Sequence, residues 1–419
     1  MTIIYFILIL GITVFIHELG HFMFAKKYGV YVYEFSIGMG PRLFKFNRKN
    51  DETDYCIRLF PIGGFVQMAG EEVEEDEDIP KEKSLRSKTA FQRFMIMVAG
   101  VMMNFILAFV LLFFIGLFND VSINNVYVNS SVIENLDDND KIVAIDDNFV
   151  NNYDKLALEM TIIEDQDFTM TVRDKEGNKK DIKVNPIAVG KSNLIYQKDY
   201  GFEVSDLKIT ESNNKDISKG DIVVAINGIK VESYLQMLKE LSKADKKLTI
   251  TLKDSKDKTK DVKIKSKENK KDELVGYSYG FYISGKEAPG LIGALKYAFL
   301  KFFSTVEQMI FTVIYLVTGK ISLSMLSGPV GIFNVVNVYS KAGFSNIVSL
   351  LSLICINVGF INLLPFPAFD GGHIVFIIIE KIKGSRVNPK VENIIHNVGF
   401  ALLMLLMVLV TYNDIIKLF

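Results

Sequence analysis

The residues best suited to chemistry are His17, Glu18 and His21, which form the pattern His-Glu-Leu-Gly-His. With only 4 His in 419 residues, this spacing arises by chance on the order of once in several hundred such sequences. On a helix the two imidazoles lie one turn apart on one face and can bind one Zn²⁺, while the intervening carboxylate reaches a metal-bound water. The pattern predicts a zinc site; the alternative is a polar patch that faces a neighbouring helix.

Asp370 is the candidate third ligand, since catalytic zinc takes three protein ligands and keeps one position open for water. It is the only formally charged residue between Phe344 and Ile379. Two prolines precede it and two glycines follow it, so the segment is not a regular helix and must be buried in protein or line a wet cavity. Its alternative role is to cap the helix that starts at Gly371, which is compatible with metal binding.

The composition combines 49% hydrophobic with 23% charged residues, so apolar and charged stretches must be segregated. The net charge of −1 argues against a nucleic-acid partner, which would need a basic face. The chain has 2 Cys, which excludes a disulfide framework and a cysteine-rich metal site. We therefore expect a lipid bilayer around part of the chain and a metal held by His and carboxylate.

Apolar stretches occur at residues 2–25, 94–118, 344–379 and 397–413, and the third is too long for one straight span. The stretch 291–319 carries three charges, and we expect it to lie in the membrane interface. Basic loops after the first stretch and before the second and fourth are cytoplasmic by the positive-inside rule, which places residues 119–285 outside. His17 then lies about 14 Å from the basic end of its helix, inside the membrane and nearer its cytoplasmic side.

Residues 119–285 are charged and contain two similar passages, at 140–147 and 220–228. Each passage precedes a predicted helix, at 153–161 or 234–241, and then two strands. This repeat, with a period of about 80 residues, predicts two small α+β modules. The modules resemble tandem PDZ domains; the second matches that family through Lys219-Gly220-Asp221 and Ile226-Asn227-Gly228, whereas the first has Asp146-Asp147 at the turn.

The whole chain resembles the site-2 protease family of intramembrane zinc proteases, in the layout of bacterial regulator-of-sigma-E proteases. The resemblance rests on the histidine motif in the first membrane helix, the segment from Asn362 to Gly372 and the PDZ-like insertion. Other family-like stretches are Phe35–Pro41, Arg58–Met68, Ala99-Gly100 with Asn104, and Ser327–Gly331. The resemblance implies that His17, His21 and Asp370 bind Zn²⁺ and that Glu18 is the general base and acid.

The resemblance also implies roles for Asn357 and Asn362 near the substrate, although hydrogen bonding between helices is an equal alternative. Residues 57–68, with Gly63 and Gly64, are expected to form a hairpin that dips into the membrane and adds the substrate as a strand. We expect Asn104 to pack between helices and His373 to contact the metal ligands without binding the metal. We expect His396 to lie at the membrane interface. The acidic run 71–78 is expected to form a solvated loop.

The predicted fold is an α-helical integral membrane protein with four transmembrane helices, a membrane-associated β-hairpin or sheet and two inserted extracytoplasmic α+β PDZ-like domains. The expected divisions are an N-terminal membrane catalytic half at 1–118, PDZ-like domains at 119–190 and 191–285, and a C-terminal membrane catalytic half at 286–419.

The predicted function is a zinc endopeptidase in a bacterial cell membrane that cleaves transmembrane segments of proteins already trimmed by another protease. Family resemblance suggests anti-sigma factors or remnant signal peptides as substrates, with the PDZ-like modules as a size filter. The alternative is a non-proteolytic zinc-binding scaffold that presents PDZ modules, and a zinc transporter is a weaker one. The open zinc position beside Glu18 favours catalysis.

Overall fold

The computed structural model describes residues 1–49, 51–71, 79–119, 121–163, 165–190, 200–244, 246–266, 274–287, 290–322 and 326–416. The chain forms two compact units. The first combines Met1–Val121 with Glu287–Phe419, and the second is Ser122–Lys286. The insertion expected from the charge pattern is therefore a separate compact unit, and each unit is described by itself below.

The first unit is mainly helical. Its long helices are α1 (Thr2–Lys27), α2 (Ala90–Phe118), α5 (Gly290–Val317), α6 (Pro329–Ala342), α7 (Phe344–Leu363), α8 (Asp370–Lys383) and α9 (Pro389–Ile416). Among the described residues, five helices are long and apolar enough to cross a membrane: α1, α2, α5, α7 and α9. They include α5, which we expected in the interface, so the count of four spans stays a prediction.

The apolar stretch 344–379 is broken, as its length predicted. Helix α7 ends at Leu363 and α8 begins at Asp370, with the proline-containing loop between them. The loop folds tightly back on α8: a Cβ placed on Gly371 would lie 2.0 Å from the carbonyl oxygen of Leu364. Glycine is therefore required where the loop meets the first turn of α8.

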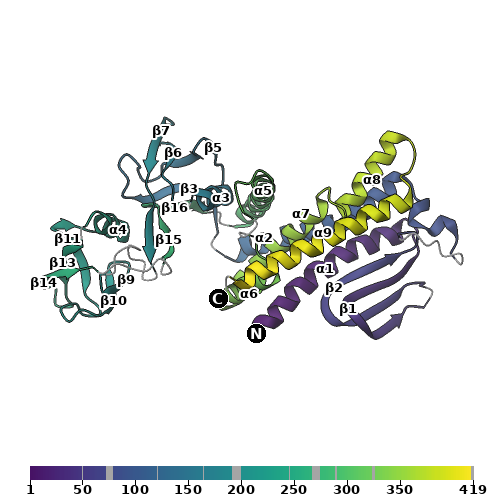
Figure 1. Cartoon of the computed structure of the whole chain (residues 1–419), viewed down its shortest axis with the longest axis horizontal. Helices are drawn as coiled ribbons and strands as arrows, with labels where there is room; N and C mark the ends of the chain where they lie inside the picture. Colours follow the sequence, from purple (N-terminus) through teal and green to yellow (C-terminus); the bar gives the residue numbers. More distant parts are fainter. Residues whose placement is uncertain are drawn as a thin grey trace. The chain divides into compact units, whose positions relative to one another are not determined.

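An antiparallel hairpin of β1 (Val32–Asn47) and β2 (Asp54–Met68) packs beside α1 (Figure 1). Residues 57–68 belong to β2 and double back within it, since Ile57 and Gly64 both pair with Ile37. Our prediction that the two arms form a hairpin by themselves is wrong, because β1 lies between them. The physical reason is that residues 34–37 of β1 pair with residues 54–57 on one side and with residues 64–67 on the other. Gly63, with φ of 86°, instead lies within β2, where the pairing with β1 is irregular.

The second unit contains two sheets of the same build, each with its own apolar core. One consists of β16 (Phe281–Glu287), β3 (Ser122–Ser131), β4 (Lys141–Ile145), β6 (Phe168–Arg173) and β7 (Lys179–Val184), with β5 (Asn148–Phe149) beside β4 and with α3 (Tyr153–Ile163). The other consists of β14 (Thr259–Lys265), β13 (Lys247–Lys253), β11 (Ile222–Ile226), β10 (Lys208–Ser212) and β9 (Phe202–Ser205), with β12 (Ile229–Lys230) and α4 (Tyr234–Lys243). A separate pair joins β8 (Ile187–Gly190) and β15 (Leu274–Ser278).

The predicted repeat is confirmed at the level of elements. The two expected helices are α3 and α4, and each follows a two-residue turn in which both residues have positive φ. Asn227-Gly228 forms this turn in the second sheet and Asp146-Asp147 forms it in the first, so aspartate takes the conformation usual for Asn-Gly. Because β16 returns to the first sheet, that sheet is not confined to residues 119–190. The PDZ assignment stays a prediction.

Candidate metal centre

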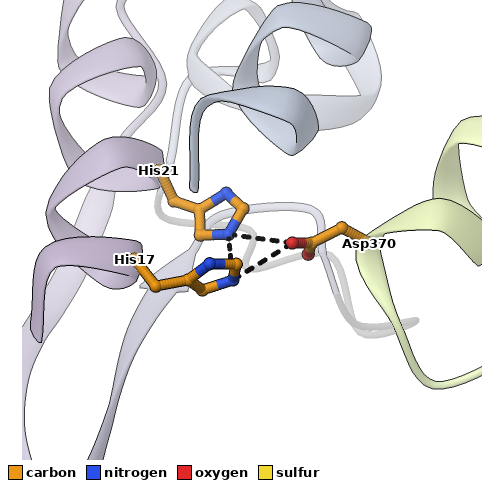
Figure 2. A group of neighbouring side chains, drawn as sticks. All are labelled: His17, His21 and Asp370. Carbon is orange, nitrogen blue, oxygen red and sulfur yellow. Dashed lines mark hydrogen bonds and ion pairs between the residues drawn. The ribbon is translucent and has the colours of Figure 1, made fainter. Parts of the chain in front are cut away.

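His17, His21 and Asp370 converge, although 349 residues separate the last two in the chain. Figure 2 shows the two imidazoles of α1 facing the carboxylate at the start of α8. The Oδ2 atom of Asp370 lies 3.1 Å from Nε2 of His17 and 3.4 Å from Nε2 of His21, and the two Nε2 atoms are 3.1 Å apart. The three predicted ligands are therefore brought together, each with one ligand atom within 4.8 Å of the others.

The Nδ1 atoms of both histidines contact α2, which leaves both Nε2 atoms for a metal. His21 Nδ1 lies 2.9 Å from the carbonyl oxygen of Ile96 and donates to it, because a carbonyl can only accept. The Nδ2 atom of Asn104 lies 3.4 Å from His17 Nδ1, and the buried Asn104 Oδ1 has no partner among the described residues; flipping the amide puts Oδ1 at the ring, where it accepts the Nδ1 proton. Such outer contacts fix the tautomer and orientation of metal-binding histidines.

Asp370 has the features of a metal ligand and not those of a helix cap. Its Oδ2 atom is buried and has no hydrogen-bond donor among the described residues, which is costly unless a cation is bound there. The cap position of α8 belongs to Phe369, so Asp370 is the first helical residue and the capping alternative is wrong. Two imidazole nitrogens and one carboxylate oxygen are a donor set that fits Zn²⁺ with one position left open.

Two glycines allow α1 and α2 to approach closely enough to build this site. A Cβ on Gly20 would lie 2.3 Å from the carbonyl oxygen of Ala99, so α1 packs directly on the backbone of α2. A Cβ on Gly100 would lie 2.3 Å from Nε2 of His21, inside the space that the imidazole fills. The small residues Ala99 and Gly100 therefore let the α2 backbone approach α1 closely enough to contact the His21 ring.

Glu18 shares one cavity with the three ligands. The cavity has a volume of about 370 Å³, and its lining includes Glu18, Asn362 and Glu71. The backbone of Val66, in β2, donates a hydrogen bond to the Glu18 carboxylate. A carboxylate that faces the ligand cluster from the same cavity can accept a proton from a water bound there.

The predicted substrate residues are only partly placed at this cavity. Asn362 lines it, and its Nδ2 lies 3.4 Å from His17 Nε2, whereas Asn357 is five residues earlier on α7 and is not among the lining residues. Gly64 adjoins Glu18, since a Cβ on it would be 3.7 Å from Glu18 Cγ. Gly63 contacts Met39 and not the ligand cluster.

Two residues at the site were assigned other roles from sequence. Asn104 is fully buried against His17, and its place as a polar residue inside the apolar stretch 94–118 was the available signal. Glu71 was expected in a solvated loop, but it lines the cavity and accepts a hydrogen bond from the N–H of Met68. Burial raises the pKa of Glu71 to about 7. The rest of that acidic run, 72–78, lies outside the described residues.

Comparison with known proteins agrees with this geometry. The family model described as "Peptidase family M50" matches residues 5–406. The zinc metalloprotease RasP of Shouchella clausii is 31% identical over 451 aligned positions, which cover 100% of this chain and 99% of the relative. The regulator of sigma-W protease RasP of Bacillus subtilis is 29% identical over 454 positions, which cover 100% of this chain and 99% of the relative.

The matches extend over the apolar helices and the three converging side chains alike; both relatives are named as proteases, and that of Shouchella clausii is named as a zinc metalloprotease. The long apolar helices agree with the membrane character expected of this family. From its sequence and its matches over nearly the whole length, the chain belongs to peptidase family M50, the site-2 proteases, and is a zinc metalloendopeptidase with membrane helices.

Proposed function

We propose that the protein hydrolyses peptide bonds within transmembrane segments of other membrane proteins, with His17, His21 and Asp370 as zinc ligands and Glu18 as general base and acid. The observation that carries this proposal is the convergence of the three ligand side chains from α1 and α8. Ionisable groups inside a membrane are expensive and are functional by default. The site would lie nearer the cytoplasmic side, since Lys26 and Lys27 end α1.

Zinc, when bound, lowers the pKa of its water to about 7 and polarises the substrate carbonyl. The Glu18 carboxylate accepts the proton of the attacking water and then delivers it to the leaving nitrogen. Asn362 offers an amide beside the ligand cluster that can donate to the substrate carbonyl oxygen as negative charge develops there. The reaction needs no covalent enzyme intermediate, because water is the nucleophile.

A substrate helix must be extended before its backbone can react, since the carbonyl of a helical peptide bond is hydrogen-bonded and covered. We propose that β2 holds the extended segment by strand addition. One fact supports this role: the Val66 backbone, in the part of β2 that pairs with Phe35, contacts Glu18. A strand paired there would bring its backbone beside the general base.

We propose further that the second unit lies outside a bacterial cell membrane and acts as a PDZ-like size filter. The support is the basic residues beside α1 and α2, which favour a cytoplasmic loop between these helices by the positive-inside rule and therefore an extracytoplasmic second unit. The substrates would be membrane proteins already trimmed by another protease, such as anti-sigma factors, or remnant signal peptides. Support for this class is the name of the Bacillus subtilis relative, regulator of sigma-W protease.

The test uses the purified full chain in lipid nanodiscs and two substrates that share one transmembrane segment. One substrate carries a short external tail, and the other carries a folded external domain. We expect cleavage of the short form only, within the apolar segment by mass spectrometry, loss of cleavage with a chelator and recovery with Zn²⁺. Cutting only outside the apolar segment would contradict intramembrane proteolysis.

Deleting residues 122–286 tests the size filter alone. The substrate with the folded external domain should then be cleaved, and its continued resistance to cleavage would reject the filter.

A further inference from the structure

The loop that carries Asp370 contains a backbone conformation that needs support. Ala368, two residues before Asp370, has φ of 82°, in the left-handed region that is unfavourable for residues with a Cβ. Strained conformations persist only where the surroundings hold them, and they gather at functional sites. What holds Ala368 therefore also sets where the Asp370 carboxylate lies.

The support comes from α9. The N–H of Ala368 donates a hydrogen bond to Nδ1 of His396, at 3.1 Å. One turn further along α9, Gly399 lies against Pro367, and a Cβ there would be 2.4 Å from the Pro367 Cβ. Consecutive turns of one helix thus contact consecutive residues of the loop. Within the loop, Phe369 N–H donates to the Phe366 carbonyl at 3.2 Å, so the restraint on Ala368 extends to the start of α8.

We propose that His396 is a positioning residue for the metal centre: by accepting the Ala368 N–H, it holds the loop in the conformation that aims Asp370 at His17 and His21. This inference rests on the proposed role of Asp370 as a zinc ligand. It replaces our expectation that His396 is only interfacial. His396 itself touches none of the three ligand side chains among the contacts of the described residues.

The same geometry argues against a second metal at His373, Glu392 and His396, whose ligand atoms lie within 4.8 Å of one another. An Nδ1 that accepts from Ala368 places the imidazole proton on Nε2, which removes that lone pair from metal binding. The His373 and His396 rings are also stacked, with centroids 4.0 Å apart and 18° between planes, so their ring-plane lone pairs do not converge on one point.

Packing alone does not explain a histidine here. Its Nε2 is buried and has no hydrogen-bond partner among the described residues, so the ring bears an unsatisfied polar group that an apolar side chain would avoid. The atom that holds the loop is Nδ1. Two amide substitutions can therefore be told apart. Asn can place its side-chain oxygen where Nδ1 lies, whereas Gln reaches the position of Nε2 and leaves a methylene at the position of Nδ1.

The experiment compares His396→Asn, His396→Gln and the neighbouring control Asn397→Leu in the purified, zinc-loaded full chain. Release of zinc to a chromophoric chelator gives the main readout, and the cobalt-substituted absorption spectrum reports ligand geometry. We expect His396→Gln to release zinc roughly tenfold faster and to lower kcat with little change in KM. His396→Asn should stay near the wild-type rate, as should Asn397→Leu. His396→Ala serves as the second truncation if the Gln variant does not fold.

Three results would overturn the proposal. One is release from a folded Gln or Ala variant at the wild-type rate, with only the thermal midpoint of the metal-free protein lowered. Another is a His396→Asn variant that releases zinc as fast as the His396→Gln variant does. The third is two zinc ions per wild-type chain with one lost in His396→Gln. Asp370→Asn tests separately the assumption that Asp370 is a zinc ligand. If this variant retains zinc as wild type does, the proposed ligand set is wrong, whatever the His396 variants show.

Discussion

Gly100 lies directly against the imidazole of His21, so closely that a Cβ on Gly100 would be 2.3 Å from the Nε2 atom that faces the metal position. The α2 backbone forms the surface on which this ligand rests, and the carbonyl oxygen of Ile96 on the same helix accepts its Nδ1 proton. The position of the metal centre thus depends on how closely α1 and α2 pack, and not only on the His-Glu-Leu-Gly-His pattern.

Gly100→Ala should displace His21 and weaken zinc binding by at least about tenfold, comparable to the loss of an outer contact. Alanine stabilises a helix by about 1 kcal/mol relative to glycine, so a loss of zinc affinity cannot come from a less stable α2. Competition with a chelator of known affinity measures the effect. Met102→Ala, at an exposed position of the same helix, is the control. Zinc affinity equal to wild type in Gly100→Ala would show that the ring is not confined there.

Asn104→Leu should raise the zinc dissociation constant by roughly tenfold, because His17 Nδ1 would lose its hydrogen-bond partner. Asn104→Asp retains an acceptor and should bind zinc more tightly than the Leu variant. The same competition assay applies, with Thr312→Val as a control that removes a hydroxyl bonded to the Gln308 carbonyl within α5. If the Leu and Asp variants bind zinc equally, the contact does not orient His17.

Asp414 links α9 to α6, and its loss should destabilise the fold without emptying the metal centre. Its Oδ2 accepts hydrogen bonds from the N–H groups of Gly328 and Gly331, each at 2.8 Å. Asp414→Ala should lower the free energy of unfolding by about 3 kcal/mol, and Asp414→Asn, which keeps an acceptor, by less. Denaturation in detergent measures this, together with zinc content. An Ala variant as stable as wild type would refute this role.

Glu71 should make stability depend on pH. Its pKa is raised by burial to about 7, from an ordinary value of 4.5, so the folded protein holds a proton that the unfolded chain has released. Stability should therefore fall as pH rises between about 4.5 and about 7, and Glu71→Gln should remove this fall. Unfolding of the metal-free protein across this range, for wild type and variant, measures the difference. A difference that does not change with pH would contradict a protonated Glu71 in the folded protein.

The convergence of His17, His21 and Asp370 was predictable because its signals are local or compositional. Two histidines four residues apart share a helix face whatever surrounds them, and Asp370 is conspicuous as a lone charge in an apolar stretch. The break before α8 was predictable for the same reason, since two prolines exclude regular helix. The repeat in the second unit followed from matching turn signals.

The remaining features depend on contacts between distant parts of the chain. The hairpin was misjudged because β1 pairs between its two arms, a contact that the sequence of residues 57–68 does not specify. The roles of Asn104, Glu71 and His396 arise from which helix or loop packs beside each, which composition and spacing do not specify. The helix α5 carries charges that favoured the interface, yet its length and apolar content also fit a span.

The central claim is that Glu18 transfers protons at a zinc site made by His17, His21 and Asp370. Its most direct test measures cleavage of a transmembrane peptide by wild type and Glu18→Gln, both with their zinc content determined. We predict equal zinc content and a loss of cleavage of roughly 10²–10⁴-fold in the variant, the range expected when general acid–base catalysis is removed. Cleavage near the wild-type rate by a zinc-loaded Glu18→Gln protein would contradict the claim.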